Sequence, residues 1–211
     1  MGHRGSKELL RGLIRSFSTE LWKDILLSLN EAHQGAWAHL EQHFSPPQAK
    51  DLVPHYRRAI FEDSMATIAR KHNLIVRSAL NKTRNASHAE IETFLLDSKR
   101  VVLTALAARD AYDFKRLRTA QFRKTLAQEA MLFPEFQHHH GDGYYGVILH
   151  GAHPEHKNSL DFAYLAFPYA DCKGWFGKYD LFLLAQQAAD SEAIEDKAQA
   201  ILRSDIIRKA E

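Results

Sequence analysis

The spacing of apolar residues along the 211-residue chain changes near residue 73, and no other feature constrains the fold as strongly. Before this point, apolar residues recur every three or four positions, which is the spacing of amphipathic helices. After it, short apolar or alternating runs stand between turn-forming residues, which is typical of β-strands. Because the helices precede the strands instead of alternating with them, the sequence predicts an α+β fold.

The first third of the chain predicts a layer of helices. Residues 7–44 carry one helically spaced apolar stripe, and Ser18 within it is a good N-cap for a second helix. Gly35 is a candidate end for that helix. Pro46, preceded by a serine, fits the first turn of another helix, and Pro54 predicts a kink or a further start.

The middle of the chain predicts an antiparallel sheet of about five strands. Apolar runs at 74–80, 144–149 and 160–167 have the length and composition of strands. Residues 88–96 alternate, a polar turn follows, and 101–107 returns as a buried strand, so these two runs predict a β-hairpin. A helix over 88–96 is the alternative.

Two further helices are expected. A basic helix is predicted over 110–131, and a last helix begins at Asp190 or Ser191. The stretch 174–189 fits neither period, because two glycines interrupt its aromatic residues. A chain of this length suits one domain. Its expected parts are a helical layer at 1–72, an antiparallel sheet with one basic helix at 73–170, and a C-terminal helical segment at 174–211.

Composition places the chain in an ordinary globular class. Hydrophobic residues make up 45% of it and charged residues 26%, the balance of a protein with a packed core. Cys172 is the only cysteine, so no intrachain disulfide forms and a cytoplasmic location is expected. No apolar run reaches the roughly 20 residues that a transmembrane helix needs, so we expect no membrane-spanning segment.

Positive charge is concentrated in one part of the chain. Residues 70–124 hold 13 lysines and arginines against 5 carboxylates, although the net charge of the whole chain is only +2. Aromatic residues are interleaved with these charges, a pattern typical of surfaces that attract phosphates and stack bases, so DNA or RNA is a candidate partner. The alternative is a solvated surface that pairs with the acidic last third. The candidate contacts are Arg84, Arg100, Lys115, Arg116, Arg118, Arg123 and Lys124.

Histidines form a second cluster. Six of the thirteen lie within 138–156, and the last three, His150, His153 and His156, follow one another at intervals of three. Three neutral imidazoles and a water can form an open catalytic metal site, for which Zn, Mn or Mg are the candidate ions. The spacing matches no established zinc motif, so polar loop histidines and a metal-free catalytic histidine are the alternatives. The glycines form neither phosphate-binding pattern, so no nucleotide cofactor is expected.

His88 and Asp161 are the candidate catalytic residues. Alternation would place His88 on one strand face with Glu90 and Glu92, from which it could reach across the sheet towards His150. Asp161 supplies a carboxylate near the histidine cluster, where it could orient a histidine or act as a general base. The alternative for His88 is a solvated strand face of mixed charge.

Three functions remain open from the sequence. The first is an intracellular, nucleic-acid-associated protein, which could also carry out metal-assisted phosphodiester hydrolysis. The second is a protein-interaction or regulatory module without catalysis, which would bind a protein partner or form a homo-oligomer. The third is a metal-dependent hydrolase of a small molecule. The sequence therefore leaves undecided whether the protein is an enzyme.

Overall fold

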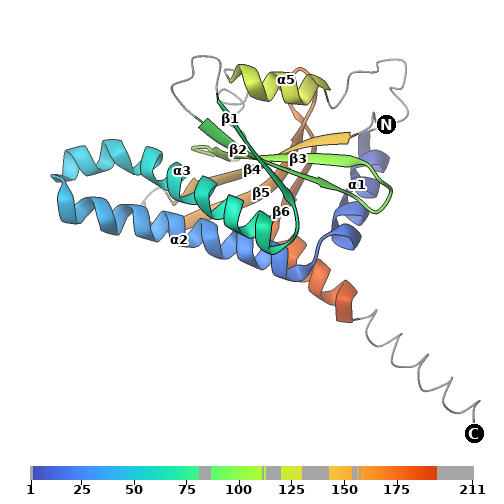
Figure 1. Cartoon of the computed structure of the whole chain (residues 1–211), viewed down its shortest axis with the longest axis horizontal. Helices are drawn as coiled ribbons and strands as arrows, with labels where there is room; N and C mark the ends of the chain where they lie inside the picture. Colours follow the sequence, from blue (N-terminus) through green and yellow to red (C-terminus); the bar gives the residue numbers. More distant parts are fainter. Residues whose placement is uncertain are drawn as a thin grey trace, which may run out of the picture.

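The computed structural model describes residues 2–80, 87–110, 112, 120–129, 143–153, 156 and 158–193. Over these residues the protein has five helices and a six-stranded mixed sheet, so the predicted α+β class is confirmed. Three helices come first, and a helix over 181–193 follows the last strand (Figure 1). None of the helices in the described residues is both long and apolar enough to cross a membrane.

The helical layer consists of α1 (Gly2–Ser16), α2 (Thr19–His43) and α3 (Pro46–Lys71). Ser18 caps α2 as predicted, since its hydroxyl accepts a hydrogen bond of 3.3 Å from the Leu21 amide. The prediction that α2 ends at Gly35 is wrong, because the buried Leu40 beyond it packs against α3 and extends the helix. α3 likewise continues through Pro54.

The sheet has six strands in chain order, rather than about five. The prediction of a wholly antiparallel sheet is wrong, because β3 and β4 are parallel while the other neighbours are antiparallel. The connection from β3 to β4 includes helix α5 (Gln121–Glu129), and such a crossover returns the chain in the same direction. The strands are β1 (Ile75–Leu80), β2 (Ser87–Phe94), β3 (Arg100–Ala107), β4 (Gly143–Ala152), β5 (Leu160–Pro168) and β6 (Trp175–Asp180).

Both later helices differ in extent from the prediction. α5 accounts only for the C-terminal half of the basic helix predicted over 110–131. The prediction is wrong at Asp110, Tyr112 and Ala120, which are not helical, and 111, 113–119 and 130–131 lie outside the described residues. The last helix begins at 181, before the predicted start at Asp190, and 194–211 lies outside the described residues. The stretch 174–189, which fitted neither the helical nor the strand spacing, contains both β6 and the first turns of this helix.

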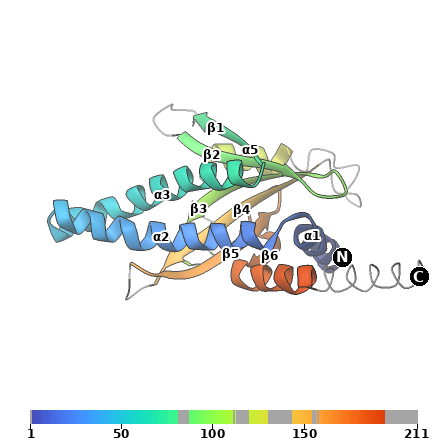
Figure 2. The same ribbon diagram turned by 60° about the horizontal axis from the view of Figure 1, so that its bottom comes forward.

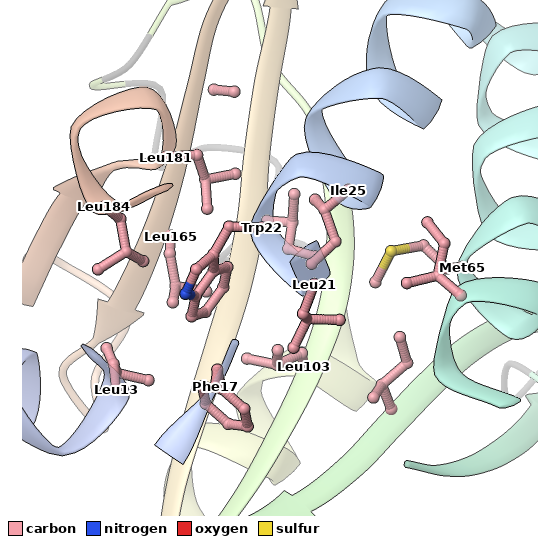
Figure 3. Close-up of a cluster of buried hydrophobic side chains, with 14 of the residues drawn as sticks. Leu13, Phe17, Leu21, Trp22, Ile25, Met65, Leu103, Leu165, Leu181 and Leu184 are labelled. Atoms are coloured by element: carbon pink, nitrogen blue, oxygen red, sulfur yellow. The ribbon is translucent and has the colours of Figure 1, made fainter. Parts of the chain in front are cut away.

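The helices pack on the two faces of the sheet unequally. α1, α2, α3 and the helix at 181–193 share a large apolar cluster with β2, β3, β4 and β5 (Figure 2). Trp22 is fully buried in this cluster, with Phe17 edge-to-face against its ring (Figure 3). α5 packs on the opposite face through Leu126 and Ala127. Among the described residues, that second face has less helical cover than the first.

α2 and α3 extend past the sheet as a helical arm, which Figures 1 and 2 both show. Leu40, Ala49 and Val53 form a small apolar cluster within the arm, and Trp37 and Tyr56 pack against it. This cluster is separate from the large one under the sheet, so contacts between α2 and α3 themselves hold the arm together.

Candidate nucleic-acid interface on strand β2

β2 carries the side chains that organise the candidate site. His88, Glu90, Glu92 and Phe94 share the face turned towards α5, while Ile91 lies in the large apolar cluster on the other face. The alternation in the sequence predicted this arrangement, and the alternative of a helix in this stretch is wrong. The polar face of one strand therefore runs from His88 at one end to Phe94 at the other.

β2 pairs with its two neighbours over different lengths. Its pairing with β1 continues to the start of the strand at Ser87, whereas in the described residues its pairing with β3 ends at Ile91 opposite Leu103. Beyond this point, the guanidinium of Arg123 in α5 donates a hydrogen bond of 2.8 Å to the Ala105 carbonyl of β3. α5 is therefore anchored where β2 and β3 part, at one end of the sheet (Figure 1).

α5 closes the His88 end of the strand face. The imidazole of His88 donates a hydrogen bond of 2.8 Å to the Glu90 carboxylate, and its ring stacks on Phe122 with 3.8 Å between ring centres. The Arg123 guanidinium lies 4.5 Å from the centre of the same phenyl ring. Burial lowers the pKa of Arg123. The predicted catalytic residue His88 and the predicted contact Arg123 thus both take part in packing α5 on the sheet.

At the other end of the strand face, two large apolar side chains are about half exposed. Glu92 is only 6% exposed, and one of its oxygens lies 3.0 Å from Arg77 and 2.8 Å from Arg100. The hydrogen bond from Arg100 is the main cause of the lowered pKa of Glu92. Phe94 is 51% exposed and Ile75 is 47% exposed on the same face. We name Ile75, Arg77, Phe94 and Arg100 the Phe94 surface.

His150 lies on the opposite face of the sheet from His88. Its Nδ1 is 3.1 Å from Nε2 of His33 in α2, and its ring packs edge-to-face against Phe61 of α3. Burial and the charge of Arg57 lower the pKa of His150 to about 3. The same two causes, together with His150, lower the pKa of His33 to about 3. The expectation that His88 reaches towards His150 is wrong, because the sheet separates them.

The structure does not bring the predicted metal ligands into one cluster. His150 points into the core, whereas His153 and His156 stack on each other in the loop after β4, with 5.1 Å between ring centres. Asp161, the second candidate catalytic residue, is exposed on β5. Within the described ranges, no three or more His, Cys, Asp or Glu side chains are arranged to hold a metal ion.

The predicted nucleic-acid contacts fall into three groups. Arg100 belongs to the Phe94 surface, whereas Arg123 and Lys124 lie on α5. Phe94 was not among the predicted site residues, although a phenylalanine among the polar positions of an alternating strand is a usable signal. The contacts that lie outside the described residues are Arg84, Lys115, Arg116 and Arg118.

Comparison of the chain with protein-family models, with curated proteins and with solved structures found no match. The function must therefore be inferred from the residues of this chain.

Proposed function

We propose that this protein binds single-stranded nucleic acid on the Phe94 surface. One observation carries the proposal: a half-exposed phenylalanine lies on a sheet face beside two arginines that share one buried carboxylate. Aromatic rings on a sheet face stack unpaired bases, and arginines beside them contact the phosphates.

Glu92 fixes the positions of Arg77 and Arg100 for contact with phosphates. The carboxylate holds both guanidinium groups in place before a ligand arrives, so less side-chain freedom is lost on binding. The Arg77 side chain is 57% exposed, so it can contact a phosphate while it stays beside Glu92. A phosphate can therefore bind without removing Glu92 from its partners.

Phe94 supplies an interaction that does not depend on the base sequence. Stacking of a base on an aromatic side chain contributes about 1–3 kcal/mol, and every base has a face that can stack. In a duplex these faces are already stacked on neighbouring bases. We therefore expect the protein to bind single strands more tightly than duplexes, with weak preference for particular base sequences.

The other basic residues predicted from the sequence as contacts are not part of the Phe94 surface. Arg84 lies in the connection between β1 and β2, and Lys115, Arg116 and Arg118 precede α5 in the chain. Their contribution is a prediction from sequence position. Metal-assisted hydrolysis is not part of the proposal, because His150 points into the core, away from the pair formed by His153 and His156.

The proposal is tested by fluorescence anisotropy with labelled oligonucleotides of about 16 nucleotides, the upper end of known single-strand site sizes. Phe94→Ala should weaken binding by about 5- to 150-fold with little change in salt dependence, because it removes stacking alone. Arg77→Ala should reduce the slope of log K against log salt by about 0.7, the value for one phosphate contact with a single strand. Arg100 stays paired with Glu92 in that variant.

Two matched controls lie on the helix-covered side of the molecule. Phe182→Ala removes a phenylalanine that is 52% exposed, and Arg11→Ala removes an exposed arginine of α1. Neither should change binding. Binding that is absent, that is insensitive to salt, or that falls equally in the controls and in Phe94→Ala would overturn the proposal.

A further inference from the structure

The helical arm carries a pair of histidines that belongs to neither of the sites predicted from the sequence. His39 and His43 are one helical turn apart on α2 and both are exposed, with their ring centres 4.7 Å apart and their planes tilted by 53°. Residues four apart lie on the same face of a helix. His39 also stacks on Tyr56 of α3 at 4.9 Å, with only 9° between the planes. The stack holds one imidazole in a fixed orientation.

The separation of the two rings suits a shared metal ion. Zinc lies about 2.0–2.1 Å from a ligating nitrogen and prefers tetrahedral angles, which puts the centres of two bound imidazoles about 5 Å apart. The 4.7 Å between His39 and His43 is close to this value. Their tilt also allows the ring nitrogens to converge. By contrast, the rings of His153 and His156 are stacked nearly face to face, with only 24° between their planes.

Two ligands complete only half of a tetrahedral shell. The described residues contain no third protein ligand arranged beside the pair. The arm extends away from the sheet, so its end can meet the arm of another molecule (Figures 1 and 2). Phe44 and Leu52, near the end of the arm, are 43% and 38% exposed and would lose contact with water in such a pairing. We propose that a zinc ion bridges two copies of this chain through His39 and His43 of each arm.

The charge of the arm is compatible with this assembly. Residues 35–55 contain one lysine against two carboxylates, so two arms repel each other little and both tolerate a cation. The completed site has four imidazole ligands, a shell of the borderline ligand type that zinc accepts. This inference does not depend on nucleic-acid binding, since the arm and the Phe94 surface share no residues.

The test is the molar mass of the full chain in solution, measured by size-exclusion chromatography with light scattering in zinc chloride and again in EDTA. Zinc should double the mass, and calorimetric titration should give one ion for two chains. The His39→Ala, His43→Ala double variant should stay monomeric in zinc. The matched control His153→Ala, His156→Ala removes another neighbouring histidine pair and should still dimerise. All of these proteins keep the run His138–His140, so any zinc held there is common to them.

A rescue variant separates loss of the ligand from damage to the arm. In His43→Cys a thiolate, which is also a zinc ligand, replaces the imidazole at the same position. This variant should dimerise in zinc, whereas His43→Gln should not. The proposal is overturned if zinc leaves the mass unchanged, if it binds one ion per chain without dimerisation, or if the double variant dimerises as the wild type does.

Discussion

The buried pair of His33 and His150 predicts that mild acid destabilises the fold. An ordinary histidine has a pKa of about 6.5, whereas burial and the nearby Arg57 charge lower the pKa of both residues to about 3. Between these values, each imidazole is protonated in the unfolded chain but neutral in the folded one. Stability conferred by neutral His33 and His150 is therefore complete above about pH 6.5 and is lost as the pH falls towards about 3.

The size of the effect follows from the linkage between protonation and folding. A pH of about 5 lies about 1.5 units below the ordinary histidine pKa. Protonation of each histidine therefore stabilises the unfolded chain by about 2 kcal/mol at that pH. The two together lower the free energy of unfolding by about 4 kcal/mol relative to neutral pH. For a chain of this length this corresponds to a fall in Tm of about 8–16 °C. Glu62 opposes this trend, because burial raises the pKa of its carboxyl group and protonation there stabilises the fold.

The assay is urea unfolding at a series of pH values from about 8 down to about 5, analysed for the free energy of unfolding. In the His33→Leu, His150→Leu variant the two titrating groups are replaced together, so neither imidazole is left without the other. Its stability should change far less over the same range. His153→Ala, His156→Ala should keep the dependence of the wild type. A wild-type protein that is equally stable at both ends of the range, or a double leucine variant that keeps the full slope, would refute the reasoning.

Three substitutions test the packing around the sheet by the same urea assay. Trp22→Ala should lower the free energy of unfolding by about 3–5 kcal/mol, because it leaves a large cavity in the main apolar cluster. Gly151→Ala should cost about 1–3 kcal/mol, because its new methyl group would collide with the Phe162 ring and lie 3.0 Å from a backbone carbonyl oxygen. Arg123→Met keeps the apolar stem but removes the hydrogen bond to the Ala105 carbonyl, so it should also cost about 1–3 kcal/mol. A change below about 0.5 kcal/mol, the range of ordinary surface substitutions, would contradict each estimate.

Local patterns in the sequence were sufficient for the elements that depend on neighbouring residues. The cap at Ser18 and the hairpin of β2 and β3 were predicted from helix-capping and strand-alternation rules. The end of α2 was not, because Gly35 is a weak local signal for a helix end and the contact of Leu40 with α3 outweighs it. The parallel pairing of β3 with β4 also depends on tertiary structure, since the strand spacing is the same for either direction.

The candidate sites were likewise predictable only where they depend on neighbouring residues in the sequence. Alternation in β2 put His88, Glu90 and Glu92 on one face, and the structure has them there. The interval of three between His150 and His153 suggested one metal site. His150 lies in strand β4 and His153 in the loop after it, so the two side chains point in different directions. The pairing of His33 with His150 joins residues 117 positions apart, and no local pattern signals such a contact.

Glu92 links the stability of β2 to its proposed function. A buried carboxylate without partners would be strongly destabilising, so at least one of Arg77 and Arg100 must stay with it in the folded protein. Arg77, the more exposed of the two, is then available for a phosphate at little cost to the fold, because Arg100 stays with Glu92. Glu92→Gln should consequently release both guanidinium groups and strengthen non-specific binding, while the loss of the held geometry weakens discrimination between single strands and duplexes. Anisotropy with both probes separates the two effects, and a Glu92→Gln protein that binds both probes less tightly would show that Glu92 does not restrain these arginines as argued.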